Sequence, residues 1–176
     1  MTLPDPLYND WINQQIRVRP DCLAVYDLTA DRPFTWKQFD ERVDALAHWL
    51  LHTGIRSGDR IAYLGLNSSD VLEIFFATLR IGAAYVPLNF RLTPPELSFI
   101  VSDCTPSAIF YDRSFRDVID AIDAKVEPEA LVESALDGSE SAYERCFLAD
   151  FAAIEPEAVN ADTLSMIMYS SGTTGK

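Results

Sequence analysis

Residues 82–101 read GAAYVPLNFRLTPPELSFIV, and this stretch contains the clearest change from strand to helix in the chain. The apolar run at residues 84–88 is typical of a short buried strand. Pro87 has no backbone N–H, so we expect it to face a strand end or a sheet edge. Thr93 to Glu96 combine a Thr cap, Pro at the first helical position and Glu at the third, which predicts that a helix begins there. The stretch is therefore one strand followed by one helix.

The same alternation extends in both directions from this unit. Before it, residues 60–66 form a second predicted strand, and a helix opens at Asp70 and ends at Gly82. The apolar spacing of that helix predicts a buried stripe of Leu72, Phe75, Phe76 and Leu79. After it come a predicted strand at residues 108–111 and a helix that Ser114 caps. Repeated strand–helix–strand units predict a largely parallel, doubly wound α/β sheet with helices on both faces.

The two ends of the chain are expected to differ from this core. Residues 23–26 and 33–34 flank a turn and predict a hairpin, expected at a sheet edge. A capping box at residues 35–38 then opens a long helix that Gly54 ends. We divide the chain, as one domain portion, into a βα core (1–126), an irregular acidic segment (127–162) and a strand with a terminal loop (163–176). Within the acidic segment we expect only a short strand at 130–132 and a short helix near 143–151.

Composition limits the possible functions. The 176 residues are 48% hydrophobic, which is enough for one ordinary globular core. The net charge of −13 lies mostly after residue 100, and an acidic surface repels phosphate backbones and anionic lipids. We therefore expect no nucleic-acid partner. Three cysteines without CxxC spacing, no signal-peptide pattern at the start and no apolar run long enough to span a membrane predict a cytoplasmic protein.

The chain closes on a Ser-, Thr- and Gly-rich loop. An apolar run at residues 164–169, a predicted strand, leads directly into Ser170, Ser171, Gly172, Thr173, Thr174, Gly175 and Lys176. Small side chains, hydroxyl groups and accessible backbone N–H groups at a strand end suit phosphate oxygens, and Lys176 adds a cation. The spacing is not that of a Walker A loop, because only two residues separate the glycines. Spacing alone leaves open a flexible Ser/Thr/Gly tail.

Two other patterns in the sequence are candidates for metal sites. His48 and His52 lie one helical turn apart, but Trp49 stands where an HExxH motif needs its Glu, so they predict a polar helix face. Asp117, Asp120 and Asp123 recur every third residue, and with basic neighbours they predict a water-facing helix side. We expect no metal site and no nucleophile triad.

Residues 168–176, Met-Tyr-Ser-Ser-Gly-Thr-Thr-Gly-Lys, resemble the signature loop of the adenylate-forming superfamily. This superfamily contains acyl-CoA synthetases, peptide-synthetase adenylation domains and firefly luciferase. Ser170 stands where Thr is commoner in the family, and it keeps the hydroxyl group. The earlier blocks that look like the family's are residues 58–62, 75–77, 82–89, 91–93 and 96–97. The resemblance covers nearly the whole chain in the expected order.

The resemblance implies an ATP-dependent carboxylate:CoA ligase. Such an enzyme joins a carboxylate to ATP as an acyl-adenylate with Mg²⁺, and then transfers the acyl group to coenzyme A. By this resemblance, residues 170–176 hold the ATP phosphates, and Arg91 is a weaker candidate for contact with coenzyme A, with a salt bridge or a capping role as its alternative. The expected substrate is a fatty or other apolar acid. An aryl-acid ligase, a peptide-synthetase adenylation domain and a non-catalytic interaction module derived from a ligase remain alternatives.

The family's other functional parts are expected to lie beyond Lys176. They include the acyl pocket, the acidic metal-linked motif and the C-terminal domain with its catalytic lysine. The resemblance therefore predicts an N-terminal fragment with no catalytic residue of its own, inactive alone and without a tightly bound cofactor. It also predicts self-association through an exposed apolar surface.

Overall fold

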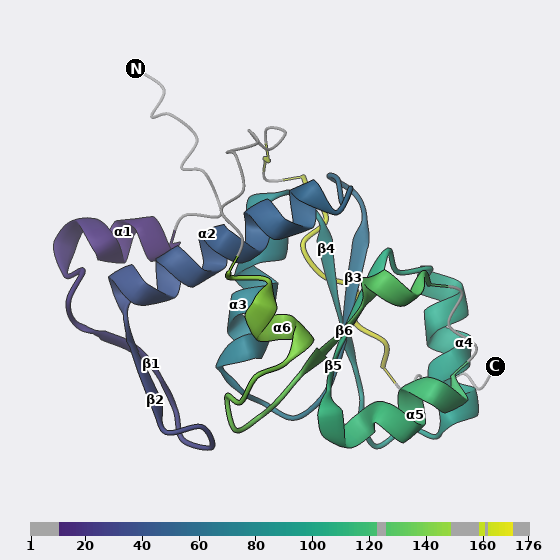
Figure 1. Ribbon diagram of the computed structural model, residues 1–176. Coiled ribbons are helices and arrows are strands. Elements are labelled where there is room, and N and C mark those ends of the chain that lie inside the picture. Colours follow the sequence, from purple (N-terminus) through teal and green to yellow (C-terminus); the bar gives the residue numbers. More distant parts are fainter. Residues whose placement is uncertain (1–10, 123–125, 149–158, 161, 171–176) are drawn as a thin grey trace.

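The computed structural model describes residues 11–122, 126–148, 159–160 and 162–170 (Figure 1). At its centre is a four-stranded parallel sheet with the strand order β4-β3-β5-β6. Its strands are β3 (Arg60–Leu64), β4 (Ala84–Leu88), β5 (Ala108–Asp112) and β6 (Leu131–Ser134). The predicted parallel sheet is therefore confirmed, and the expected strand at 130–132 corresponds to β6.

Helices cover both faces of this sheet, as the doubly wound prediction requires (Figure 1). On one face lie α2 (Trp36–His52), α3 (Ser69–Arg80) and the short α6 (Ala142–Arg145). On the other lie α4 (Pro94–Cys104) and α5 (Arg116–Ala121), which follows the 3-10 turn η1 (Arg113–Phe115). Successive strand residues alternate between the two clusters: Ile61 and Tyr63 face α2 and α3, whereas Ala62 and Leu64 face α4. The remaining helical elements are α1 (Trp11–Val18) and the 3-10 turn η2 (Pro128–Ala130).

The two predicted capping boxes are confirmed in detail. Thr35 accepts a hydrogen bond from the N–H of Gln38, and the Gln38 side chain accepts one from the N–H of Thr35, which completes the capping box of α2. At α4, the Glu96 carboxylate accepts from the N–H and hydroxyl of Thr93 at 2.8 and 2.7 Å. The predicted Ser114 cap is wrong, because the side chain of Asp112 caps the 3-10 turn η1 and accepts the N–H of Ser114 at 2.9 Å.

The hairpin is present, but the expectation that it lies at a sheet edge is wrong. Strands β1 (Leu23–Asp27) and β2 (Arg32–Thr35) form a separate two-stranded antiparallel sheet. Its apolar side chains Ala24, Val25 and Phe34 pack against the cluster that contains α2 and α3. The hairpin is therefore stabilised by side-chain packing on helices and not by extension of the parallel sheet.

The predicted buried stripe of α3 is also wrong. Leu72 is 38% exposed, and Phe75, Phe76 and Leu79 are only partly buried. The buried face of α3 consists instead of Ser69, Asp70, Glu73, Ile74, Ala77 and Thr78. Two carboxylates can lie on this face because they meet arginines from other elements, as described next.

We call five charged side chains and one tyrosine the charged network: Arg32, Arg42, Asp70, Glu73, Glu144 and Tyr143. Arg42 of α2 donates to both carboxylate oxygens of Glu73 at 2.7 and 3.0 Å. The buried hydroxyl of Tyr143 in α6 donates to the same carboxylate at 2.7 Å. Arg32 of β2 bonds to Asp70 at 3.0 Å and to Glu144 at 2.9 Å. The network therefore joins the hairpin, two long helices and α6.

The expected strand at residues 164–169 forms only one bridge, in which Met166 pairs in parallel with Tyr85 at the outer edge of β4. The N–H of Tyr85 donates to the carbonyl of Ser165, and the N–H of Ile167 donates to the carbonyl of Tyr85. The next bond of a parallel ladder would need an N–H on residue 87, and proline has none. Pro87 thus faces the outer edge, as predicted, and it ends the pairing after one bridge.

Two further observations concern the environment of the chain. None of the helices in the described part is long and apolar enough to cross a membrane. Cys22, Cys104 and Cys146 are all free thiols, and burial raises the pKa of Cys146 to about 12.

Candidate functional site

The candidate site lies at the carboxyl end of β4, where open α/β sheets bind their ligands. After Leu88 the chain turns through residues 89–93 into α4, and the Asn89 side chain accepts the backbone N–H of Arg91 at 3.0 Å. The turn is closed by a bond from the N–H of Leu92 to the carbonyl of Asn89. This turn brings the first residues of α4 close to residues 169 and 170.

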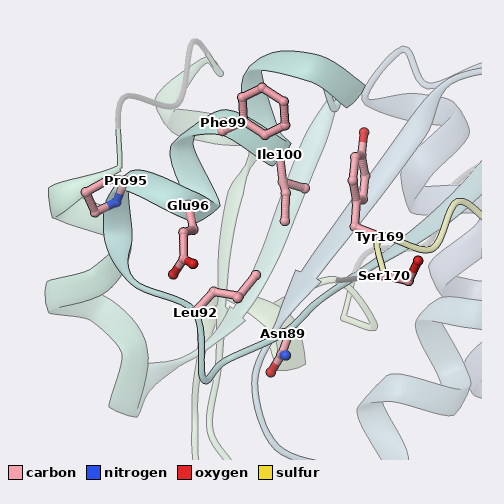
Figure 2. Close-up of a pocket in the computed structure, with 8 residues that line it drawn as sticks. All are labelled: Asn89, Leu92, Pro95, Glu96, Phe99, Ile100, Tyr169 and Ser170. Atoms are coloured by element: carbon pink, nitrogen blue, oxygen red, sulfur yellow. The ribbon is translucent and has the colours of Figure 1, made fainter. Parts of the chain in front are cut away.

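A cavity of about 530 Å³ lies between these two parts of the chain. Figure 2 shows side chains from α4 and its preceding turn on one side, with Tyr169 and Ser170 on the other. Its lining residues are Asn89, Leu92, Pro95, Glu96, Phe99, Ile100, Tyr169 and Ser170. The wall is therefore mostly apolar, with an amide, a carboxylate and a serine hydroxyl placed around it. Its size lies within the usual range for small-molecule sites.

Hydrogen bonds hold both walls of this cavity. The hydroxyl of Tyr169 donates to Asp103 of α4 at 2.6 Å, which ties the segment after Met166 to the far end of that helix. Partial burial, the bond to Asp103 and that residue's negative charge raise the pKa of Tyr169, so the phenol stays protonated at neutral pH. Among the described residues, the backbone pairing of this segment with β4 is the single bridge at Met166, and Tyr169 and Ser170 line the cavity beyond it.

The electrostatics of the α4 wall do not favour an anion. Bonds from the hydroxyl and N–H of Thr93 lower the pKa of Glu96, so its carboxylate stays charged. That carboxylate occupies the helix start, where an oxyanion would otherwise find N–H donors and a favourable dipole. The charge of Glu96 would therefore repel an anion placed against the start of α4.

The predicted site residues fall into two sets. Ser170 lines the cavity and is exposed, while residues 171–176 lie outside the described part of the chain. Arg91 lies in the turn beside the cavity, exposed, with its guanidinium 5.0 Å from the ring centre of Phe90. Among the described residues no acidic group forms an ion pair with Arg91. Within the described residues, Arg91 therefore does not form the salt bridge that was the alternative to contact with coenzyme A.

The two metal-like patterns do not form sites in the described residues. No group of three or more His, Cys, Asp or Glu side chains there could hold a metal ion. Asp44, which precedes the two histidines on α2, pairs with Arg80 at 2.5 Å. Asp117 and Asp120 are exposed, as predicted for a water-facing side, and Asp123 lies outside the described residues.

Comparison with known proteins gives the family. The family model described as "AMP-binding enzyme" matches residues 12–176, which is nearly the whole chain. The chain belongs to the AMP-binding enzyme family. This assignment confirms the resemblance drawn from residues 168–176 and from the earlier blocks.

Among curated relatives, the long-chain-fatty-acid–CoA ligase FadD13 of Mycobacterium tuberculosis is 36% identical over 165 residues, covering 93% of this chain and 32% of the relative. The indoleacetate–CoA ligase of Aromatoleum aromaticum is 33% identical over 96% of this chain and 33% of its own length. The solved Mycobacterium tuberculosis fatty acyl CoA synthetase superimposes with a TM-score of 0.76 at 33% identity, over 94% of this chain and 33% of that one. This AMP-binding chain thus spans about a third of the length of its relatives.

Sequence reasoning missed part of the cavity wall in this AMP-binding chain. The sequence places Asn89 at the end of a family block, and Tyr169 at the end of a predicted strand and within the signature-loop resemblance, but it assigns neither residue to a cavity. The available signal for Asn89 was an amide directly after a buried strand, a common place for a ligand contact. The bond between Tyr169 and Asp103 joins residues 66 positions apart, and no local pattern predicts it.

Proposed function

We propose that this chain is the N-terminal portion of the AMP-binding domain of an ATP-dependent carboxylate:CoA ligase, an acid–thiol ligase. The observation that carries this proposal is a family match over residues 12–176 whose relatives include CoA ligases for fatty and indoleacetic acids. A fatty or other apolar acid is the proposed substrate, and the 36% identity to a fatty-acid ligase supports it. The division into residues 1–126, 127–162 and 163–176 stays part of the proposal.

In the proposed reaction, residues 170–176 bind the phosphates of ATP. Ser170 supports this role, because its hydroxyl lies at the end of an extended segment that enters the cavity. Preorganised hydroxyl and N–H donors there would stabilise charge on the departing pyrophosphate. Lys176 adds a positive charge, and Arg91 is proposed to contact the nucleotide part of coenzyme A.

Magnesium is proposed to enter with ATP. The described residues provide no group of ligands for it, and we derive no step through the metal. The proposed compartment is the cytoplasm, which the three free thiols support. We also propose that the chain alone binds ATP weakly and forms no acyl-adenylate, because the acyl pocket and catalytic lysine that the family resemblance implies are not among its residues.

The experiment joins this chain to the remaining two thirds of FadD13, which supply the acyl pocket, and measures ATP–pyrophosphate exchange with long-chain fatty acids. We expect exchange with long-chain fatty acids and none from the 176-residue chain alone. Absence of exchange from a folded joined protein would contradict the proposal that this chain supplies the ATP-binding part of a CoA ligase. Robust exchange by the chain alone would contradict its proposed inactivity.

Arg91 is tested separately in the joined protein. Arg91→Ala should raise the KM for coenzyme A several-fold and leave pyrophosphate exchange unchanged, because exchange precedes the thiol step. An unchanged KM for coenzyme A would remove Arg91 from the proposed site.

A further inference from the structure

Ser170, the first residue of the proposed phosphate-binding segment, lies beyond the last backbone bond that the structure shows between its segment and β4. That bond joins the N–H of Ile167 to the carbonyl of Tyr85 at 2.9 Å. Among the described residues, no backbone–backbone hydrogen bond involves residues 168, 169 or 170. Backbone pairing with β4 therefore does not set the position of Ser170.

A side-chain bond at the preceding residue connects this segment to α4 instead. The hydroxyl of Tyr169 donates to the carboxylate of Asp103 at 2.6 Å, and a hydrogen bond to a carboxylate is stronger than one between neutral groups. The ring of Tyr169 also packs against the apolar cluster under α4. Tyr169 and Ser170 line the same cavity (Figure 2). The bond to Asp103 thus fixes the residue directly before Ser170.

The helix that carries Asp103 is itself held at both ends. At its start, the capping box described above satisfies the N–H groups of the first turn. At its end, the guanidinium of Arg60 in β3 donates to the carbonyls of Cys104 and Thr105 at 2.8 and 2.7 Å. These bonds connect the end of α4 to an inner strand of the parallel sheet. Asp103 therefore offers Tyr169 an acceptor on a rigid support.

We propose that Asp103 is a positioning residue for the adenylate-forming step: through Tyr169 it holds Ser170 at the cavity before ATP binds, a role that rests on the proposed function. Without this bond the segment would sample other positions, and only the fraction with Ser170 in place would bind the phosphates. The apparent affinity for ATP falls with that fraction, whereas the complex formed with ATP is the same. The bond therefore lowers the KM for ATP and leaves kcat unchanged.

Pyrophosphate exchange in the protein joined to the remainder of FadD13 tests this role. Tyr169→Phe removes the hydroxyl and keeps the ring, and Asp103→Ala removes the acceptor. Each should raise the KM for ATP about three- to tenfold with kcat unchanged. The double variant should match the single variants, because both substitutions break the same bond. Asp103→Asn keeps an acceptor oxygen and should restore most of the affinity that Asp103→Ala loses.

Tyr26→Phe is the matched control for the loss of a tyrosine hydroxyl. The hydroxyl of Tyr26 also donates to an aspartate, Asp31, but in the hairpin, which packs on the opposite face of the sheet. This variant should leave the KM for ATP unchanged. The positioning role would be overturned by an unchanged KM for ATP in Tyr169→Phe and Asp103→Ala. A lower kcat at unchanged KM would overturn it as well, because it indicates only a loss of folded protein.

Hydrogen–deuterium exchange of the 176-residue chain tests the bond without ATP. The N–H of Ile167, which its bond to Tyr85 protects, should take up deuterium several-fold faster in Tyr169→Phe than in Tyr26→Phe. Equal rates would overturn the positioning role even if the joined protein is active. Absence of pyrophosphate exchange in the unsubstituted joined protein would instead contradict the proposed function, and the deuterium rates would still decide whether the bond holds the segment.

Discussion

The face of the sheet under α2, α3 and α6 is packed around the charged network, whereas the face under α4 and α5 is packed from apolar side chains, with the buried Asp112 at its end capping η1. The network bonds join residues between 31 and 112 positions apart. Directional bonds of this kind fix how separate segments are oriented, and apolar contacts do so less strictly. The charged face therefore holds the hairpin and α6 in place, while the apolar face leads to the cavity.

The largest expected loss of stability comes from a substitution in the charged network. Glu73 is fully buried, and Glu73→Gln leaves the guanidinium of Arg42 without its bidentate partner. Removal of one partner from a buried pair costs about 3–5 kcal/mol of the free energy of unfolding, and the ion pair that Arg42 keeps with Glu144 at 3.0 Å places the expected loss in the lower part of that range. Urea denaturation should show this loss.

The control for this substitution is Glu41→Gln. Glu41 pairs with Lys37 at 4.0 Å, and the two side chains are 62% and 64% exposed, so the expected change is below about 0.5 kcal/mol. Equal effects of Glu73→Gln and Glu41→Gln would show that the charged network contributes nothing special to stability.

A slightly smaller effect is expected on the apolar face. Leu97 of α4 is fully buried among apolar neighbours, so Leu97→Ala removes transfer energy and leaves a cavity. The expected cost is about 3 kcal/mol, against almost none for Leu148→Ala, whose side chain is 81% exposed. A loss of unfolding free energy for Leu97→Ala that depended strongly on pH would contradict the description of this face as apolar.

The pH dependence of stability sharpens the comparison further. Burial, helped by the nearby charge of Glu73 and opposed by Arg32, raises the pKa of Asp70 from 3.8 to about 7. Between these two pH values the folded protein keeps a proton on Asp70 that the unfolded protein has released. The free energy of unfolding therefore falls as the pH rises from about 4 through 7. The expected loss between pH 5 and 8 is about 2 kcal/mol.

Asp70→Asn should remove this dependence, because the amide does not titrate. Thermal or urea denaturation of both proteins across this range provides the measurement. A stability profile of Asp70→Asn as steep as that of the unsubstituted chain would contradict the assignment to Asp70.

Local signals in the sequence predicted the apolar face better than the charged one. The capping box from Thr93 to Glu96 and the edge position of Pro87 follow from chemistry within a few residues. The burial of Glu73 does not, since its partners Arg42 and Tyr143 are 31 and 70 residues away. Apolar spacing alone placed Leu72 in the buried stripe of α3. In the structure Glu73 is buried instead, because it pairs with Arg42 of α2.

The candidate site shows the same division between local and distant signals. The loop from Ser170 to Lys176 was found by its residue types and by its resemblance to a family motif. The cavity beside Ser170 depends on Pro87 stopping the ladder and on Tyr169 reaching Asp103. The sequence shows the proline. That it limits the pairing of β4 with a segment about 80 residues later follows only from the structure, which shows the two segments side by side.

The most direct test of the proposed ligase site is the rate of ATP–pyrophosphate exchange in the chain joined to the remainder of FadD13, with and without Lys176→Ala. Loss of one preorganised donor to a departing phosphate group typically costs a factor of about 100. Lys37→Ala is the matched control, because this lysine is exposed on α2. The account predicts a drop of about that size for Lys176→Ala and no change for Lys37→Ala; an unchanged rate with Lys176→Ala would contradict it.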